Sequence, residues 1–525
     1  MASFDVVIAG GGHNSLIVGC YLAKAGQKVC IVEKNPKTGG SVATEERIPG
    51  FLQDTCSVAH SLILGNPLMR NDELQLLSKY GLHYEMPDKL TAIYFDDGTS
   101  LEFFDDIDET CASVAKFSEK DARAYRTFVE EVYKTLDMMV MGMFSVPPAP
   151  GVQAMMMDQS PEGREMMRLQ QISSWDLICE WFDHPKVRIA LARYASEAMM
   201  DPFDNGTGFG FYLILPYMHK YGMGIPRGGS GELARALTDC FKDHGGTVKL
   251  DSEVVRIKIE DGEAKGLILA SGEEVLASKA VVTGLHVTQV FPKMVDGFDL
   301  PADFVHRLSR IKYATLKPFV VQLALKEPVK FKVGEAISDF YWVDKSHSDI
   351  EEFAAKLKEL QNGRIVRDFA AWCQMYKADP TRVPEGQGMM HIYAFAPLDL
   401  KDGGREKWDE IGEEVALGFV DDLRQQCTNL TDDNIIGMHF RTPLDIMRYN
   451  NALVEADIQH IGFYAWQLAG NRPAPGWASY RSPVPKLYMT AGSTHPGGGV
   501  TGGPGRNATQ IIMEDLGLDF DSVTG

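Results

Sequence analysis

A glycine-rich turn and a single acidic residue carry the clearest chemical signal in this chain. The turn, Gly10-Gly11-Gly12-His13-Asn14-Ser15, follows an apolar β-branched run at 4–9 and precedes a helical pattern over 16–25. A second apolar run at 29–32 ends on Glu33. The elements that must position these residues are therefore a strand, a helix and a second strand, in the order and spacing of a dinucleotide-binding βαβ unit.

Each residue of this unit has a physical role. Gly10 permits the tight turn, and Gly12 has no side chain, so that a pyrophosphate can approach the backbone and the free N–H groups of the helix N-terminus. Ser15 stands where the usual pattern has a third glycine, and it is still small enough for close packing. Glu33 can accept hydrogen bonds from both ribose hydroxyls and would repel a 2′-phosphate, which disfavours NADP. An ordinary glycine-rich turn of an α/β domain is the alternative.

Two further glycine-rich stretches are typical of the same kind of site. One follows the acid directly and ends in Gly39-Gly40-Ser41, whose backbone can fold over nucleotide phosphates. The other lies at 493–505, between an apolar strand at 486–492 and a helix from 506 to about 516. A strand that ends in a glycine turn before a helix again leaves N–H groups free. We therefore expect the last strand and helix to return to the nucleotide domain.

Composition and charge restrict the class of protein. The 525 residues are 45% hydrophobic and 24% charged, which suits two or three globular domains. The net charge of −20 argues against binding to nucleic acid and against electrostatic docking on anionic lipid. The eight cysteines form no C-x-x-C pair, so neither a redox dithiol nor a metal site is expected. We expect no signal peptide and no membrane span, and hence a cytoplasmic protein.

The order of elements predicts an α/β fold in which a Rossmann-type domain is interrupted by a mixed α+β substrate domain. Segments 1–85, 216–300 and 480–525 are assigned to the nucleotide domain, and 86–215 and 301–479 to the substrate-binding or lid domain. Alternating apolar residues predict a hairpin of strands at 253–259 and 264–269, and further strands are expected at 279–284, 319–325 and 389–396. Helices and loops, rather than sheet, are expected over the whole of 86–215. Ligands commonly bind at such a domain interface.

Several motifs together resemble those of phytoene-desaturase-like flavoproteins. They are Gly11-Gly12-His13-Asn14-Ser15-Leu16, Gly39-Gly40, Pro226-x-Gly228-Gly229-x-Gly231, Tyr480-Arg481-Ser482-Pro483 and, most specifically, the tail at 492–505. Within this glutathione-reductase-like and amine-oxidase-like superfamily, the chain is most similar to the branch of pyridine nucleotide-disulfide oxidoreductase domain-containing protein 2. The resemblance implies FAD in an extended conformation, with its adenosine at the N-terminal unit and its flavin ring near the C-terminal glycines.

The nucleotide pattern and the resemblance together imply a set of cofactor-binding residues. At the adenosine and phosphate end these are Gly10, Gly12, His13, Asn14, Ser15, Glu33, Lys34, Gly39, Gly40, Ser41 and Val254, whose backbone would pair with the adenine edge. At the flavin end they are Gly492, Gly498, Gly499, Val500 and Thr501. Free N–H groups at the flavin end can stabilise the negative charge of the reduced flavin.

Catalytic residues are harder to assign, because the flavin accepts the hydride and the protein mainly orients the substrate. His60 lies in a segment that by resemblance approaches the flavin, and it is a candidate proton acceptor or a structural histidine. Arg481 is a candidate to offset negative charge on flavin or substrate, with an interdomain ion pair as the alternative. Tyr341, Trp342 and Trp466 are candidate walls of a hydrophobic substrate channel, with core packing as the alternative.

Two methionine clusters, at 138–143 and 155–157, have no assigned role. Methionine makes adaptable apolar surfaces, so these clusters predict a lid, a membrane-touching entrance for an apolar substrate, or buried helix packing. A peripheral membrane contact and a homo-oligomer both stay open as partners.

The sequence as a whole predicts an FAD-dependent dehydrogenase or desaturase acting on a small hydrophobic substrate, isoprenoid or alicyclic. A hydride would pass to flavin N5, and the electrons would continue to oxygen, a quinone or another carrier. An amine-oxidase-like flavoenzyme, a redox-neutral flavin isomerase and a non-catalytic flavin-binding interaction protein are the alternatives.

Overall fold

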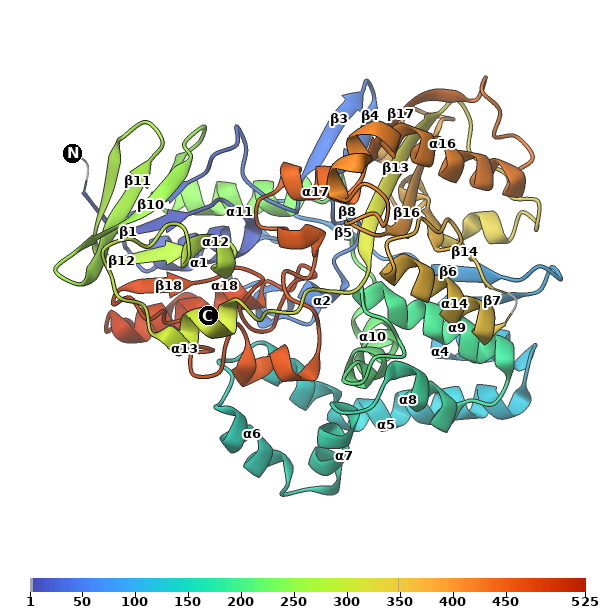
Figure 1. Ribbon diagram of the computed structural model, residues 1–525, viewed down its shortest axis with the longest axis horizontal. Coiled ribbons are helices and arrows are strands. Elements are labelled where there is room, and N and C mark those ends of the chain that lie inside the picture. Colours follow the sequence, from blue (N-terminus) through green and yellow to red (C-terminus); the bar gives the residue numbers. More distant parts are fainter. Residues whose placement is uncertain (1–2, 348) are drawn as a thin grey trace.

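Two seven-stranded sheets organise the molecule, one at the left and one at the right of Figure 1. The computed structural model describes residues 3–347 and 349–525. The strands of the first sheet are β1 (Ser3–Ala9), β2 (Val29–Val32), β9 (Thr247–Lys249), β10 (Val254–Glu260), β11 (Glu263–Leu269), β12 (Glu274–Thr283) and β18 (Leu487–Met489). Those of the second sheet are β6 (Lys89–Tyr94), β7 (Ser100–Phe104), β13 (Lys317–Leu325), β14 (Trp342–Lys345), β15 (Ala370–Cys373), β16 (Gly388–Ala396) and β17 (Ile435–Arg441).

The first sheet is the Rossmann-type sheet expected from the sequence. Strand β1 pairs in parallel with β2 and β12, and β12 pairs in parallel with β18. Strands β10 and β11 form the expected antiparallel hairpin beside β12. The crossover from β1 to β2 is helix α1 (His13–Lys24), which packs against α11 (Gly231–Asp243) and α18 (Gly503–Asp515). The N-terminus of α1 therefore lies at the carboxyl ends of β1 and β2, where ligands bind in open α/β sheets.

Burial on both faces explains why the central strands are apolar throughout. Val6 and Ile8 pack in one core with side chains of α1, α11 and α18. Val7 and Ala9 point to the opposite face, where the core includes β10–β12, α12 (Val287–Val290) and α13 (Ala302–Leu308). A parallel strand that is covered on both faces needs a nearly continuous apolar sequence.

The second sheet has one apolar face and one face that carries polar groups. Phe319 and Val321 of β13 pack in a core with Phe419 of α16 (Trp408–Gln426). On the other face, Gln322 donates to the backbone carbonyl of Asp54 at 2.6 Å, and Arg441 donates to that of Thr55 at 2.7 Å. The polar face therefore lies against a segment that belongs to the first part of the chain.

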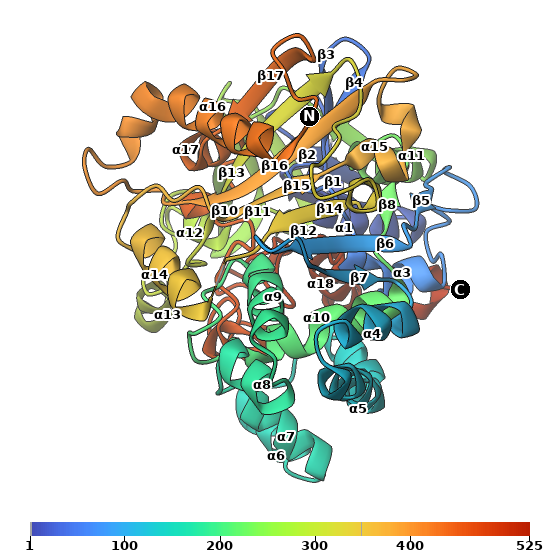
Figure 2. The ribbon, with the colours of Figure 1, turned by 90° about the vertical axis from the view of Figure 1, so that its right-hand side faces the viewer.

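A group of helices supports this sheet from one side, below the strands in Figure 2. They are α4 (Ile107–Ala115), α5 (Glu119–Met143), α6 (Pro150–Met157), α7 (Pro161–Leu169), α8 (Ser174–Trp181), α9 (Pro185–Ala195) and α10 (Gly208–Tyr221). Phe128 of α5 contacts the rings of Trp181, Phe182 and Phe211, so that aromatic packing joins these helices. Helices α6 and α7 form the part that lies farthest from the strands in both views.

The sequence predicted only helices and loops over 86–215, and this prediction is wrong for two strands, β6 and β7. These strands form an antiparallel hairpin at the edge of the second sheet. The turn between them closes through a hydrogen bond from Phe95 N to Thr99 O at 2.9 Å, with Gly98 at φ 81°. The pattern Asp97-Gly98 between apolar residues is a hairpin signal that the sequence interpretation overlooked.

Each sheet takes its strands from one of the two predicted sets of segments. Those of the first sheet lie within 1–85, 216–300 and 480–525, and those of the second within 86–215 and 301–479. The domain boundaries themselves stay a prediction.

The remaining α-helices and strands are β3 (Thr44–Ile48), β4 (Phe51–Asp54), β5 (Tyr84–Glu85), β8 (Ile225–Pro226), α2 (Ser61–Leu64), α3 (Pro67–Arg70), α14 (Ile350–Gln361), α15 (Met375–Ala378) and α17 (Pro443–Tyr449). Across the described chain, each helix is too short or too polar to cross a membrane.

Candidate functional site

The first glycine turn is held open by Glu33. One carboxylate oxygen of Glu33 accepts the N–H of Gly11 at 2.7 Å, and the other accepts the backbone and side-chain N–H groups of Asn35 at 2.9 and 2.8 Å. Gly10 has φ 88°, a conformation that favours glycine. The acid therefore fixes the turn that precedes α1, at the end of the strand where a ribose is expected to lie.

The turn that carries Lys34 and Ser41 folds back over the first one. Gly39 donates to the carbonyl of Gly11 at 2.9 Å, and a Cβ on Gly40 would lie 3.3 Å from the Cα of Gly12. Lys34 and Ser41 are both half-buried. The two glycine turns thus form one backbone surface, and the contact of this surface with nucleotide phosphates stays a prediction.

Gly12 faces open space in this surface. A Cβ added to Gly12 would meet no atom within 4 Å, although its φ of −68° is accessible to any residue. Helix α1 begins at His13 without a side-chain cap, so that N–H groups of its first turn have no helical partner. The hydroxyl of Ser15 has no hydrogen-bond partner in the described chain either, but it is buried against Gly284, so the free donors at the gap are backbone N–H groups. This is a cradle of free donors beside a gap, which suits an anionic group.

The C-terminal glycines meet this cradle directly. A Cβ on Gly505 would lie 2.6 Å from the carbonyl oxygen of Asn14, so that α18 begins in close contact with α1. Asn14 Oδ1 accepts the N–H of Gly505 at 3.3 Å. Thr501 Oγ1 accepts the N–H of Gly503 at 3.1 Å, and Val500 has φ 55°. The N-termini of two helices therefore point into one region, although 490 residues separate them along the chain.

Unpartnered polar atoms surround the C-terminal glycine stretch. The Oε1 atom of Gln459 lies 3.6 Å from the Cβ position of Gly499, and it has no hydrogen-bond partner within the described residues. A Cβ on Gly498 would lie 2.8 Å from the Cα of Gln459, and one on Gly492 would lie 2.7 Å from the ring of His460. The buried Nδ1 atom of His460 also has no partner among those residues. The sequence interpretation missed Gln459 and His460, because only the fold brings them to the glycines.

The expected adenine contact, Val254, lies near the acid. Val254 is buried at the start of β10. Two residues earlier, Ser252 donates to the carbonyl of Glu33 at 2.9 Å. The structure therefore places Val254 on the same side of the first sheet as Glu33, and its pairing with adenine stays a prediction.

His60 has the surroundings of a structural histidine. Its Nε2 atom lies 2.6 Å from the hydroxyl of Ser230 and its Nδ1 atom 3.1 Å from that of Tyr84, and the side chain is fully buried. Burial, reinforced by His13, lowers the pKa of His60 to about 3. Both ring nitrogens are engaged, so the geometry favours the structural alternative over the proton acceptor.

Arg481 lies at the wrong end of α18 for a role at the flavin. Its guanidinium pairs with Asp515 at 2.7 Å and with Glu514 at 3.0 Å, on the protein surface. These acids end the helix that begins at Gly503, about 18 Å away for a rise of about 1.5 Å per residue. The geometry therefore favours the ion-pair alternative, with both partners inside the predicted segment 480–525, and a role of Arg481 at the flavin stays a prediction.

The three candidate substrate residues lie in different environments. Trp342 is half-buried, and its ring meets those of His391 and Tyr393 edge-on at 6.4 and 6.2 Å. Register pairing through Cys373 and His391 places Trp342 on the face of the second sheet that also carries Gln322. Trp342 alone of the three keeps a position suited to a substrate wall.

Trp466 lies at the surface. Its side chain is 53% exposed and stacks on Tyr464 with 4.4 Å between ring centroids, beside the ammonium group of Lys312. This arrangement gives it no place in an enclosed channel.

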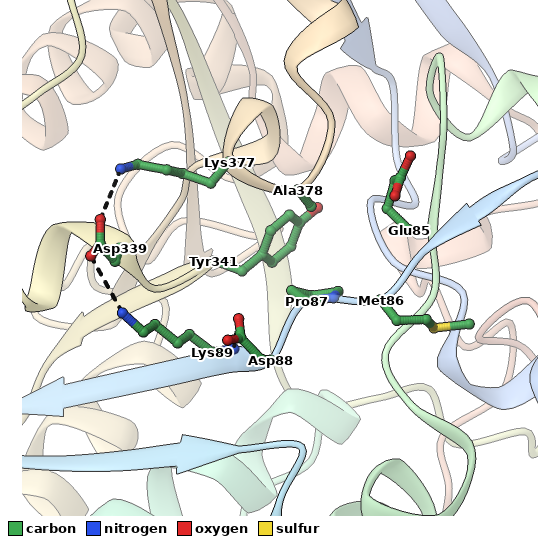
Figure 3. Close-up of a pocket in the computed structure, with 9 residues that line it drawn as sticks. All are labelled: Glu85, Met86, Pro87, Asp88, Lys89, Asp339, Tyr341, Lys377 and Ala378. Carbon is green, nitrogen blue, oxygen red and sulfur yellow. Dashed lines mark hydrogen bonds and ion pairs between the residues drawn. The ribbon is translucent and has the colours of Figure 1, made fainter.

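Tyr341 lines a polar cavity of about 240 Å³ instead of an apolar one (Figure 3). Lys89 and Lys377 pair with Asp339 at 3.3 Å each along one wall. The buried hydroxyl of Tyr341 donates to the carbonyl of Val58 at 3.2 Å. Charged walls do not suit a hydrocarbon, so this cavity is a poor candidate for the expected substrate channel.

Comparison with known proteins gives consistent results. The sequence pattern of the family described as flavin containing amine oxidoreductase matches residues 16–394. A limonene dehydrogenase subunit from Castellaniella defragrans is 24% identical, with 98% of this chain and 95% of the relative covered. Rat pyridine nucleotide-disulfide oxidoreductase domain-containing protein 2 is 26% identical over 98% and 94%. The lycopene-forming phytoene desaturase of Pseudescherichia vulneris is 21% identical over 97% and 99%.

A solved structure shows the same fold. An oxidoreductase from Methanosarcina mazei superposes with a TM-score of 0.62 and 16% identity, covering 97% of this chain and 99% of the other.

The described residues fit a flavin adenine dinucleotide. The open backbone at Gly12 and the free N–H groups of α1 suit the pyrophosphate, and Glu33 lies where the ribose would be. At the other end, Gln459 and His460 present buried polar atoms without partners beside the C-terminal glycines. Polar edges of a flavin ring are groups that can satisfy such atoms. Within the described chain, no cluster of three or more metal-ligating side chains occurs.

Proposed function

Since the chain belongs to the family of flavin-containing amine oxidoreductases, we propose that it oxidises a hydrophobic substrate, isoprenoid or alicyclic, by removal of a hydride from carbon. The protein is an FAD-dependent oxidoreductase. The observation that carries the cofactor part of the proposal is the open backbone at Gly12 together with the buried polar atoms of Gln459 and His460, which have no partner among the described residues. Relatives named as a limonene dehydrogenase and a phytoene desaturase match nearly the whole chain, which supports a hydrocarbon-like substrate.

The protein's share of the chemistry is binding, orientation and exclusion of water. A bound FAD would supply the acceptor for a hydride from carbon, and the proton released from the adjacent carbon would pass to solvent water. Glu33 and Gly12 hold the nucleotide, and the ring of Trp342, which packs beside Tyr393, forms part of the substrate wall. His60 stays neutral and hydrogen-bonded, so that it keeps the segment 54–61 in place.

One pair of variants tests the cofactor placement. Gly12→Ala adds a methyl group to the open gap without strain, so the apoprotein keeps its melting temperature while FAD affinity falls at least ten-fold. Gly210→Ala is the matched control, because its Cβ also meets nothing within 4 Å but lies in α10. Full FAD affinity in Gly12→Ala would contradict the placement.

Anaerobic reduction of the bound flavin tests the substrate class. We expect bleaching of the flavin spectrum by cyclic or linear terpenes and no bleaching by primary amines. Bleaching by amines alone would support the second candidate, an amine oxidase, which the matched family name favours. Product without net reduction would indicate a redox-neutral isomerase. A flavin that no compound reduces or converts would favour a non-catalytic flavin-binding protein.

The electron acceptor is proposed to be oxygen, a quinone or a separate carrier protein. The relative from Castellaniella defragrans is named as one subunit of an enzyme, which supports a partner chain. Turnover of terpene can be measured under air, under argon with a soluble quinone, and under argon alone. Turnover under air indicates oxygen as the acceptor, turnover with quinone indicates a quinone, and no turnover in any of the three indicates a separate carrier protein.

We also propose that the methionine-rich segment contacts a membrane surface from which an apolar substrate enters. No charged residue occurs from Met138 to Met157, and the exposed large hydrophobic side chains there are Met138, Met141, Val152, Met155 and Met156. The base of the segment contacts the flavin end, since His495 Nε2 lies 2.9 Å from the carbonyl of Gly142.

Vesicle sedimentation tests this contact. The triple variant Met141→Glu, Met155→Glu and Met156→Glu should lose binding to phosphatidylcholine vesicles. Leu417→Glu, an exposed apolar residue of α16, should keep it. Absence of binding by the unmodified protein would overturn this part of the proposal.

A further inference from the structure

Arg472 is a fully buried arginine whose acceptors are all backbone carbonyls. Its guanidinium donates to Gln459 at 2.7 Å, to Ile461 at 3.0 Å, to Gly492 at 2.7 Å and to Thr494 at 3.2 Å. Two of these residues precede Arg472 in the chain and two belong to the C-terminal glycine stretch. One side chain therefore joins the two segments that surround the flavin end of the site.

The guanidinium also lies directly beneath the glycines. A Cβ on Gly497 would lie 3.3 Å from the central carbon of Arg472, and the same carbon lies 5.4 Å from the ring of Phe463. Glycine is needed at position 497 because its φ is 129° and because a Cβ there would lie 2.5 Å from the ring of Phe463 as well as 3.3 Å from the guanidinium carbon. Gly497 therefore packs against both Phe463 and Arg472.

The charge of Arg472 has no direct counter-ion. Among the described residues, no carboxylate oxygen lies within 4 Å of its guanidinium, although Asp457 acts on it from farther away. The oxygens of Asp457 are occupied by the N–H groups of Ala314 and Gln459. Burial lowers the pKa of Arg472 to about 9, so that it is still charged at neutral pH.

The histidines around Arg472 are kept neutral, so that Asp457 is the charged neighbour that acts on it. Burial lowers the pKa of His286 and of His495 to about 4, and the positive charge of Arg472 adds to both effects. The pKa of His460 is lowered by burial, by His286 and by Arg472. His286 and His460 stack at 5.7 Å, and His286 Nε2 lies 2.8 Å from the carbonyl of His460. Arg472 is therefore the fixed positive charge in this neighbourhood at neutral pH.

We propose that Arg472 is a positioning residue that sets the reduction potential of the flavin. It holds the carbonyls of Gln459 and Gly492 together, and its buried charge stabilises the negative charge that a flavin carries after two-electron reduction. A low local dielectric strengthens the electrostatic effect of a fixed charge on its surroundings. Charge near the flavin ring is one means by which proteins tune its electronic properties. This inference rests on the proposed function, because it requires FAD with its ring at the C-terminal glycines.

Reduction potentials of matched variants test the inference. Arg472→Met removes the charge, Arg472→Gln removes it but keeps a donor for the carbonyls, and Arg472→Lys keeps it. We expect the equilibrium constant for flavin reduction to fall at least ten-fold in the Met and Gln variants, or about 30 mV for a two-electron couple. The Lys variant should keep a potential close to that of the unmodified protein, although its apoprotein melts at a lower temperature.

A second buried arginine provides the control. Arg382 is fully buried but pairs with Asp54 at 2.8 Å at the junction with the second sheet. Arg382→Met should lower the melting temperature without changing the potential. An unchanged reduction potential in Arg472→Gln or Arg472→Met with FAD bound would overturn this inference but not the proposed function. If the Met variant does not fold, the potential of the Gln variant decides. An unmodified protein that binds no FAD would overturn the proposed function together with it.

Discussion

The key side chains at the candidate site form their hydrogen bonds with backbone groups. Glu33 accepts the N–H of Gly11, and Arg472 donates to carbonyls of Gln459 and Gly492. The side chains that hold the glycine turns are thus placed by hydrogen bonds to the turns themselves. Charge-assisted hydrogen bonds of this kind are stronger than neutral ones.

Replacing Glu33 should weaken FAD binding more than it weakens the fold. Glu33→Ala removes the acceptor for the N–H of Gly11 and the expected acceptor for the ribose. We expect FAD affinity to fall by ten-fold or more and apoprotein stability by about 1–3 kcal/mol, as a charged hydrogen bond is lost. Isothermal titration with FAD and urea unfolding of the apoprotein measure the two effects. Retention of full affinity would place the ribose elsewhere.

His60 should affect stability and leave the pH profile unchanged. His60→Ala removes the partner of the Tyr84 hydroxyl and one of the two partners of the Ser230 hydroxyl, and it opens a cavity, which should cost about 2–4 kcal/mol. Since His60 is neutral and fully hydrogen-bonded, the pH dependence of flavin reduction by substrate should stay as it is. Disappearance of an ionisation from that profile would restore the proton-acceptor role.

At the scale of elements, the site is the meeting point of two helix N-termini. Helix α1 follows β1 directly, whereas α18 reaches the same place from the far end of the chain. Gly505 allows the contact, because any side chain there would meet Asn14 and Ile17. Two aligned helix dipoles then favour negative charge in one region.

Gly505→Ala should lower the stability of the apoprotein, whereas Gly12→Ala should leave the melting temperature of the apoprotein unchanged and lower only the FAD affinity. Its Cβ would lie 2.6 Å from the carbonyl oxygen of Asn14 and 2.9 Å from the Cβ of Ile17, so that α18 must move away from α1. We expect the apoprotein to lose about 1–3 kcal/mol, as overpacked sites do, with a parallel loss of FAD affinity. Thermal unfolding of both apoproteins checks this contrast. Equal melting temperatures would show that the helices separate freely.

The whole molecule contains many buried neutral histidines. Burial lowers the pKa of His60 and His391 to about 3 and that of His286, His495 and the half-buried His13 to about 4. In the unfolded chain these side chains take up protons near pH 6.5. The unfolded state therefore binds more protons between about pH 4 and 6.5, and stability must decrease as the pH falls through this range.

Mild acid should therefore destabilise the protein before its carboxylates titrate. Each histidine whose pKa is lowered by about two units contributes about 3 kcal/mol once acidification is complete. Urea unfolding at pH 7.5, 6.5 and 5.5 with constant excess FAD measures the slope. His391→Gln should reduce the slope, since it removes one of these groups. Stability independent of pH over this range would show that the histidines are protonated in the folded state.

The amino-acid sequence by itself determined the first βαβ unit, the hairpin over 254–269 and the return of the tail to the nucleotide sheet. These features depend on local order: an apolar run, a glycine turn and a helix within about forty residues, or two alternating runs around a short turn. The overlooked hairpin of β6 and β7 belongs to the same class, because its Asp97-Gly98 turn is also a local signal.

Only the tertiary structure decided what the isolated side chains do. His60 is a structural histidine because Ser230 and Tyr84 reach it from distant segments, and Arg481 lies at the far end of α18. Arg472 had no signal in the sequence at all, since its acceptors are backbone carbonyls and every residue has one. Which carbonyls converge on a guanidinium depends on long-range packing, and no pattern of residue types records it.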